Sequence, residues 1–432
     1  MNQETAVDFS ADFSTPPELD GGRHPAAPPN PASSHPAGHP GSHHSSDLSS
    51  HSANHPSSSP PTHPSHARTP GLEDTERGVS APVLAASAAL RKAMIVPVIS
   101  ALAIGAIFVA VYLAAFHAPS ARYEPLGIAA PDTVAAKTEL ALNNADPSAF
   151  TFYRYTDEAA ARQAIEHDVV PAVVVDDSSG MRLLVAGAQG PSTVSTLDAA
   201  VTVAVGRQLP VQDVVPLAAG DARGLSVFYS AFGVVLAGFL FALASYQMAP
   251  RLPLVARVVS MTAFAFASGV LVALIAHTGF SALPASFGMV ALLVGLLAWA
   301  TAAGTGVLLR VCGPLGVSVA SIVMLIFGNA TSGGILPTNF LPAWLSPLAQ
   351  VLPPAAAVRG LRGAAYFHNA DLPNALFTLA GWVVVCLALQ YVLDRVAARR
   401  QARDHVGAPS EAHTAAPAPA TGAGGLAATP SI

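Results

Sequence analysis

The residues with the most distinctive types and spacing form one run in the last third of the chain. Asn329 and Ser332 precede the pair Gly333-Gly334, and Pro337 follows. Two glycines allow a tight turn where a helix leaves a membrane. The two polar side chains can satisfy the backbone groups that such a turn frees, or they can line a path for a solute. A purely structural turn accounts for the same residues, so both interpretations stay open at this point.

Two arginines follow this run, three residues apart. Arg359 and Arg362 would share one face of a helix. Long basic side chains near a membrane surface extend toward the lipid headgroups. The sequence therefore favours contact with lipid phosphate or with the membrane interface for both arginines, and no catalytic role.

Several kinds of chemistry are missing from the sequence. No Asp, Glu or Lys occurs between Arg223 and Asp371, whereas proton-coupled and ion-coupled carriers keep such groups inside the membrane. The chain has no Gly-x-x-x-x-Gly-Lys-Ser/Thr run for nucleotide phosphates and no Gly-x-Ser-x-Gly or His-Glu-x-x-His motif. Asp176 and Asp177 are adjacent and point apart in a strand or turn. We therefore predict neither an enzyme nor a site for a metal or cofactor.

Composition indicates an integral membrane protein. Of the 432 residues, 52% are hydrophobic and only 11% are charged, against about 25% charged in soluble domains. The net charge of −5 argues against a nucleic-acid partner. Apolar runs long enough to cross a bilayer as helices predict six transmembrane helices, at 93–116, 226–247, 258–276, 287–309, 311–327 and 375–393.

The two ends of the chain differ from this apolar part. Residues 1–88 are rich in His, Pro and Ser and hold nine of the fifteen histidines. Such a composition buries too little apolar surface to fold, so we predict a disordered tail. Loose metal capture by these histidines and a tail without any defined site are both open. Residues 397–432 are predicted as a second disordered tail.

Residues 117–224 are predicted to fold as a small α/β domain between the first two membrane helices. Strand-like segments occur at 150–155, 172–175 and 181–185. Helical patterns occur at 157–167 and at 191–209, where Pro191 stands at the start.

Basic residues set the predicted orientation. Arg91 and Lys92 precede the first apolar run, Arg310 follows the fourth, and a cluster of arginines follows the last. By the positive-inside rule both termini lie in the cytoplasm of a multi-pass plasma-membrane protein, and the α/β domain lies outside.

Within the five-helix membrane region 226–396, the segment 328–372 is predicted as re-entrant or interfacial. Its apolar residues recur at helical spacing from Leu341 to Leu352, with Trp344 as an anchor at the interface. An ordinary helix packed on the bundle is the alternative.

One helix, a large outer domain and five further helices form a layout that resembles the membrane subunits of type-2 ABC transporters. The helix-then-strand element at 157–175 is similar to that of the family. The run from Gly328 to Pro337, followed by Leu352-Pro353-Pro354 and by Val358-Arg-Gly-Leu-Arg362, resembles the phage-infection-protein (Pip) branch, which includes fungal nitrosoguanidine-resistance proteins. The resemblance covers roughly residues 90–396.

This resemblance implies a permease subunit, embedded in the lipid bilayer, that exports a hydrophobic or amphipathic substrate. Energy would come from a separate nucleotide-binding ATPase that docks on Arg251 to Arg257 and on the segment before Arg91. The family also implies a homodimer. The alternative is a non-transporting scaffold, surface receptor or secretion accessory protein that works through the outer α/β domain.

Overall fold

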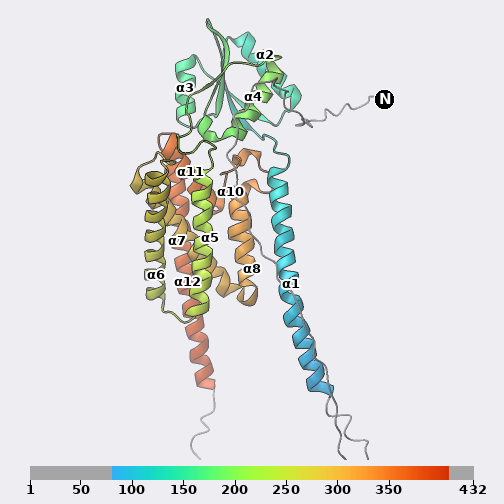
Figure 1. The fold of residues 1–432 in the computed structure, drawn as a ribbon, viewed down its shortest axis with the longest axis vertical. Coiled ribbons are helices and arrows are strands. Elements are labelled where there is room, and N and C mark those ends of the chain that lie inside the picture. Colours follow the sequence, from blue (N-terminus) through green and yellow to red (C-terminus); the bar gives the residue numbers. More distant parts are fainter. Residues whose placement is uncertain (1–79, 408–432) are drawn as a thin grey trace, which may run out of the picture. The chain divides into compact units, whose positions relative to one another are not determined.

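A computed structural model describes residues 80–407 of the chain, with side chains described for residues 90–403. An α/β domain and a set of long helices make up this part (Figure 1). The predicted tail segments 1–79 and 408–432 lie outside the described residues, and so do the nine histidines of the N-terminal segment.

The α/β domain is built on one mixed sheet of five strands in the order β2-β1-β3-β4-β5. Strand β1 pairs in parallel with β2 and β3, β3 pairs antiparallel with β4, and β4 pairs in parallel with β5. The elements of the domain are β1 (Glu124–Ala129), α2 (Asp132–Ala145), β2 (Phe150–Arg154), α3 (Glu158–Glu166), β3 (Ala172–Asp177), β4 (Gly180–Val185), η1 (Gly187–Gln189), α4 (Pro191–Val205) and β5 (Val211–Asp213).

Alternating side chains of the central strands cover the two faces of the sheet. In β3, Val174 joins the core beneath α2 and α4, whereas Val173 and Val175 join the core beneath α3. All three are at most 1% exposed, because a central strand flanked by helices is buried on both faces. The three strands and two helices expected at 150–209 are present, and β1, α2 and β5 are additions to that prediction.

The helical part contains six helices long and apolar enough to cross a membrane, among the described residues, and this confirms the predicted number. The elements are α1 (Ser80–Phe116), α5 (Ser226–Met248), α6 (Leu254–Ala273) with the π-helical turn η2 (Leu274–Gly279), α7 (Phe287–Val311), η3 (Gly313–Leu315), α8 (Gly316–Ala320), η4 (Ser321–Phe327), α9 (Gly328–Ala330), η5 (Thr338–Phe340), α10 (Ser346–Val351), α11 (Pro353–Tyr366) and α12 (Leu372–Gly407).

Helix α7 is the centre of the bundle. Its apolar window is 78% buried, and its side chains share one core with α5, α6, α11 and α12. The crossing with α6 is close because Gly269 has no side chain: a Cβ there would lie 2.2 Å from the carbonyl oxygen of Ala291. Small residues at such crossings let helix backbones approach each other in a membrane protein.

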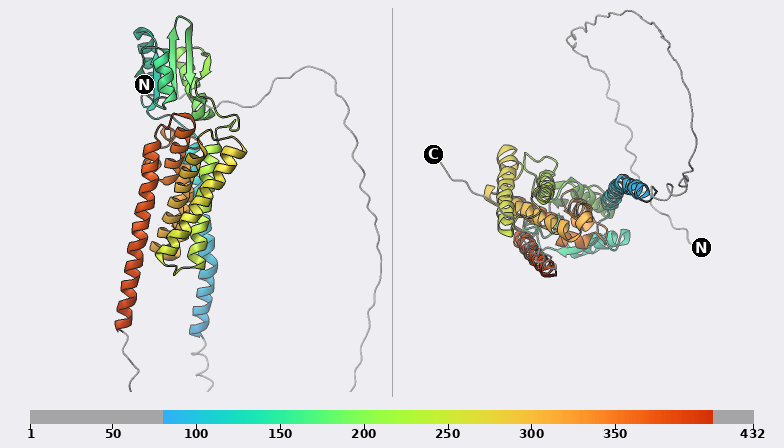
Figure 2. Two further views of the ribbon diagram at one scale, coloured as in Figure 1. Left: turned by 90° about the vertical axis from the view of Figure 1, so that its left-hand side faces the viewer. Right: turned by 90° about the horizontal axis from the view of Figure 1, so that it is seen from below.

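Among the residues whose side chains are described, helix α1 contacts the rest of the structure through its C-terminal half. Val111 and Ala115 pack against the segment that runs from η4 to α11. Met94 and Leu102, nearer the start of the helix, are more than 60% exposed, and only 6% of the apolar window is buried. The N-terminal part of α1 and the C-terminal part of α12 both run past the ends of α5 to α7 (Figure 2).

Two phenylalanines from the helical part complete the two cores of the α/β domain. Phe340 of η5 joins the core beneath α2 and α4, and Phe367, just after α11, joins the core beneath α3. Both are at most 2% exposed. His167 and His368 add a stacked pair with ring centroids 5.2 Å apart. The domain is therefore attached to the bundle on both faces of its sheet.

Three predicted boundaries differ from the structure. Residues 80–88 belong to α1 and residues 397–407 belong to α12, so neither stretch is part of a tail. The apolar spacing from Leu341 to Leu352 yields only the short α10, and the longer helix is α11, which begins at the Pro353-Pro354 pair. Proline is favoured in the first turn of a helix, where its missing N–H has no partner to lose.

Most of α11 lies in the bundle core beside α7, as in the packing alternative for this segment. Trp344, the proposed interfacial anchor, is 56% exposed and meets the ring of Phe327 edge-on.

Candidate functional site

A cavity of about 350 Å³ lies between the α/β domain and the adjoining end of the helical bundle. Its wall comes from the start of β1, the connection after α3, the end of η1, the segment between α9 and α10, helix α11 and the residue before α12. Five residues singled out from the sequence line it together: Ser332, Gly333, Pro337, Arg359 and Arg362.

The glycine pair makes the turn that leads into this wall. Gly333 has φ of +76°, a conformation that favours glycine, and a Cβ on Gly334 would lie 2.7 Å from the ring of Phe228. The Ser332 hydroxyl donates to the carbonyl oxygen of Asn329 at 2.8 Å and accepts from the Gly334 amide at 3.3 Å. The local contacts of this run are those of a structural turn, and the turn places Ser332 and Gly333 at the cavity.

Asn329 and Gly334 do not line the cavity. Asn329 is 1% exposed and donates to the carbonyl oxygen of Leu325 at 2.9 Å. Its side-chain oxygen has no hydrogen-bond partner among the described residues.

The two arginines are turned toward protein groups. The Nε of Arg359 donates to Asp371 at 2.8 Å, and its Nη1 donates to the carbonyl oxygen of Ala349 at 2.7 Å. Arg362 donates to the carbonyl oxygen of Gly333 at 3.2 Å, and burial lowers the pKa of its guanidinium group. Both arginines therefore contact protein groups in the cavity wall, and the contact with lipid phosphate stays a prediction.

Two acidic residues in the wall were not predicted as site residues. Glu124 begins β1 and is 3% exposed. Burial raises the pKa of its carboxyl group to about 7, and nearby Asp168 acts in the same direction against a hydrogen bond from Asn339. One carboxyl oxygen, Oε2, has no hydrogen-bond partner among the described residues. No local pattern around Glu124 indicates this burial, which arises from the distant segment that carries Asn339.

Asp168 follows α3 at a backbone φ of +60°. Burial raises the pKa of its carboxyl group to about 6, while the charge of Arg362 and a hydrogen bond from Gln189 oppose that rise. Its position in the helix-then-strand element was visible in the sequence, but its contacts with Gln189 and Arg362 were not.

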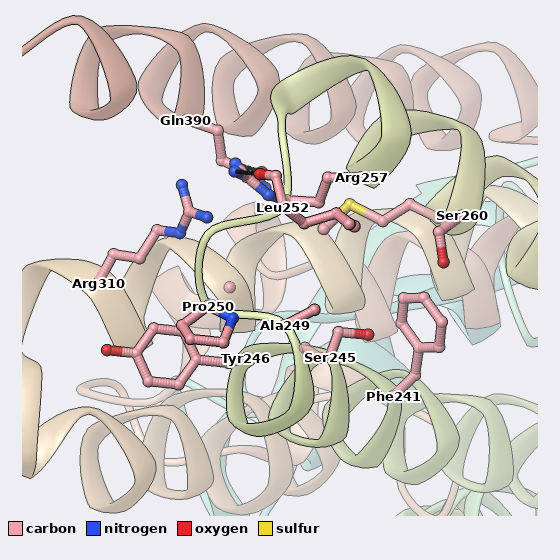
Figure 3. Close-up of a pocket in the computed structure, with 13 residues that line it drawn as sticks. Phe241, Ser245, Tyr246, Ala249, Pro250, Leu252, Arg257, Ser260, Arg310 and Gln390 are labelled. Atoms are coloured by element: carbon pink, nitrogen blue, oxygen red, sulfur yellow. Dashed lines mark hydrogen bonds between the residues drawn. The ribbon is translucent and has the colours of Figure 1, made fainter. Parts of the chain in front are cut away.

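A second polar cluster lies at the other end of the bundle, around a cavity of about 30 Å³ (Figure 3). Arg257 of α6 donates to Gln390 at 3.2 Å, to Asp394 at 3.4 Å and to the carbonyl oxygen of Leu252 at 2.7 Å. Arg310 of α7 donates to the other Asp394 oxygen at 2.8 Å. Figure 3 shows Arg257 and Gln390 pointing toward one another from α6 and α12.

This cluster ties three helices together. Gln390, which is 1% exposed, also donates to the carbonyl oxygen of Ala303 in α7 at 3.3 Å. The remaining space is about the volume of one water molecule in the liquid. We therefore assign the cluster a structural role, and the cavity beside the α/β domain is the candidate site for a ligand.

Within residues 80–407 no group of three or more His, Cys, Asp or Glu residues could hold a metal ion. In comparisons with known proteins, no protein-family model, no curated protein and no solved structure matched this chain. The proposals below accordingly start from the cavity and from the helices that surround it.

Proposed function

We propose that the chain is the membrane subunit of a transporter that exports a hydrophobic or amphipathic substrate, with energy supplied by a separate ATPase. The observation that carries this proposal is the broken fifth span, Gly313–Ala330. It passes from a 3₁₀ turn through α8 and the π-helical η4 to α9, and its end turns into the cavity wall. Irregular helices at membrane depth occur where protein or a water-filled path covers them.

The proposed orientation follows from the basic residues. Arg251 and Arg310 lie toward the end of the bundle that is remote from the α/β domain, and so do Arg399 and Arg400 of α12. With this end in the cytoplasm of a plasma-membrane protein, the α/β domain and the large cavity face outward. A substrate that leaves the membrane would meet this cavity on the outer side.

A second copy of the chain is part of the proposal. The first half of α1 leaves its apolar side chains uncovered, and α7 fills the interior of the five-helix group. A path for a substrate would then run between two copies rather than through one, with α1 and the broken span on that boundary.

The surface proposed for docking of the ATPase differs from the one predicted from the sequence. The connection from α5 to α6 contains only residues 249–253, too few for a docking helix. Arg257 is held by Gln390 and Asp394, whereas Arg251 is exposed. Docking would therefore use Arg251 together with the extended ends of α1 and α12.

This short connection also supports the alternative function, a surface receptor or scaffold without transport. In that case the cavity beside the α/β domain would bind the ligand, and the helical bundle would anchor the domain in the membrane.

Purification from native membranes followed by mass spectrometry separates the two functions. We expect a nucleotide-binding subunit in stoichiometric amount, and the variant Arg251→Glu should lower its recovery, whereas Arg207→Glu on the exposed surface of the α/β domain should not. Recovery of the chain without any ATPase would contradict the transporter proposal and favour the receptor.

Cysteine labelling tests the orientation. In a background with Cys312 and Cys386 replaced by alanine, Ser178→Cys in the β3–β4 turn should react with an impermeant reagent in intact cells. Gln401→Cys in α12 should react only after the cells are opened. Both positions are exposed in the structure, and the reverse pattern would overturn the orientation.

A further inference from the structure

The charged groups of the large cavity do not balance. Three carboxyl groups and two guanidinium groups line it, so one negative charge is in excess when all five are ionised. Arg359 is paired with Asp371 at 2.8 Å. Arg362 is attracted by Asp168 and by Asp221, which lies behind the wall.

The carboxyl group without a cationic partner is that of Glu124. Neither Glu124 nor Asp168 forms an ion pair with a Lys, Arg or His among the described residues. The charge of Arg362 lowers the pKa of Asp168, however, whereas no cation acts in this way on Glu124. A buried charge of this kind is unfavourable unless a counter-charge reaches it. The cavity beside Glu124 gives a counter-charge room to bind.

The dimensions and walls of the cavity restrict what that counter-charge can be. A volume of about 350 Å³ lies at the lower end of the range for small-molecule pockets. Pro125, Pro171 and Val358 supply apolar wall beside the charged groups. A metal ion would need more carboxylate or imidazole ligands than the described residues gather at any one place.

We propose that this cavity binds a small organic amine in its protonated form, with the ammonium group on the Glu124 carboxylate and a short apolar body against the proline and valine walls. An ammonium group supplies both the missing charge and hydrogen-bond donors for the carboxylate. As a statement about binding, this inference goes beyond the proposed function and does not depend on transport.

The test uses three probes of nearly equal size and different charge: 4-fluorobenzylamine, 4-fluorobenzyl alcohol and 4-fluorobenzoate. Binding to the purified full chain in detergent is followed by fluorine NMR at about pH 8, where Glu124 is ionised. We expect the amine to bind at least about tenfold more tightly than the alcohol, the factor that one charge-assisted hydrogen bond supplies, and the benzoate to bind least. Equal binding of all three probes would overturn the proposal.

The variant Glu124→Gln keeps the shape of the side chain and removes its charge. It should lower the affinity for the amine about tenfold or more and leave the affinity for the alcohol unchanged. The control Glu139→Gln alters the ion pair with Arg154 on the domain surface. It should leave the affinities for both probes unchanged. Unaltered amine binding in a folded Glu124→Gln protein would also overturn the proposal.

A pH series on the unmodified protein keeps the test independent of any variant. Amine binding should weaken as the pH falls through about 7 because Glu124 takes up a proton. Asp168, whose pKa is raised to about 6, also takes up a proton near this range. The other titratable groups near the cavity are His167, His368, Arg359, Arg362 and Asp371. The part of the pH dependence of amine affinity that disappears in Glu124→Gln is due to Glu124. If amine affinity depends on pH in the same way in both proteins, the amine does not bind to the Glu124 carboxylate.

Discussion

The two ends of the helical bundle bury charge in different ways. At the end remote from the α/β domain, Arg257 and Arg310 share Asp394, and Gln390 fills the remaining positions around a cavity of about 30 Å³. At the other end the cavity is about 350 Å³, and Glu124 in its wall has an oxygen without a partner among the described residues.

This difference distinguishes a structural polar cluster from a ligand-binding site. A buried polar network whose members are all satisfied holds its elements in one arrangement, as the first cluster does for α6, α7 and α12. A buried carboxylate with an unmatched charge and open space beside it is unfavourable on its own and becomes favourable when a cation binds. Burial of charge alone does not distinguish a structural cluster from a binding site. The hydrogen-bond and ion-pair partners of the charged group, and the volume of the cavity beside it, make that distinction.

The largest loss of stability is expected at Asp394. Asp394→Ala removes the common partner of Arg257 and Arg310 and leaves two partly buried cations together. Removal of one member of a buried ion pair costs about 3–5 kcal/mol, and we expect about 3 kcal/mol here because the Asp394 side chain is 35% exposed. The measurement is denaturant or thermal unfolding of the purified protein in detergent.

Asp394→Asn is the matched control, since it keeps the hydrogen-bonding shape and should lose less stability than the alanine variant. Arg395→Ala, one residue along, removes an exposed hydrogen bond and a cation–π contact with Tyr391 and sets the baseline for an exposed position. If Asp394→Ala is no more destabilising than Arg395→Ala, the cluster does not stabilise the packing of α6, α7 and α12.

The next effect is a gain of stability at Glu124. The native protein holds the proton of Glu124 up to a pH of about 7, while the usual pKa of this carboxyl group is 4.5. Between these values the unfolded chain has lost the proton and the native state has kept it, so this carboxyl group lowers stability as the pH rises from about 4.5 to 7. Glutamine imitates the protonated form at every pH.

Glu124→Gln should therefore match the unmodified protein near pH 4.5 and be more stable above pH 7. The shift corresponds to about 3 kcal/mol, and we expect about 2 kcal/mol because the cavity is wide enough for water to reach the carboxyl group. Unfolding temperatures across this pH range measure the effect. Identical profiles for the two proteins would mean that Glu124 is not buried as the structure shows.

Much of the fold follows from local properties of the sequence. The six apolar helices are found by length and hydropathy alone. The run of valines in β3 and the Asp157 cap, which accepts from the Ala160 amide at 2.8 Å, indicate a strand and a helix start directly. Strand β1 was missed because Pro125 and Gly127 both disfavour a strand. Residues 397–407 are predicted as part of a tail, although their alanines and arginines favour a helix.

The site could be predicted only in part. The run from Asn329 to Pro337 stands out because glycines, a proline and polar residues interrupt an apolar region. That Ser332, Gly333 and Pro337 lie beside Arg359 and Arg362 follows from packing of the turn on α11, which no spacing reveals. Glu124 and Asp168 are ordinary acidic residues of a polar domain in the sequence. The burial of Glu124 and the position of Asp168 near Arg362 depend on contacts with segments far away in the chain, so they appear only in the folded protein.

A minor loss of stability is expected at Arg359, in the wall of the large cavity. Arg359→Ala removes an ion pair with Asp371 in which the two side chains are 23% and 32% exposed, so we expect a loss of only about 1 kcal/mol. Asp371 keeps a hydrogen bond from Asn374 at 2.7 Å. The cavity, however, gains a second uncompensated negative charge.

Arg359→Ala should therefore bind the protonated amine more tightly, by a few-fold, while its stability falls slightly. The fluorine NMR titration and an unfolding curve on the same sample measure both changes. Arg359→Lys restores the positive charge and should return the affinity toward that of the unmodified protein. A loss of amine affinity in Arg359→Ala, in a protein that remains folded, would mean that the arginine serves the ligand rather than Asp371, and that this end of the bundle attracts anions.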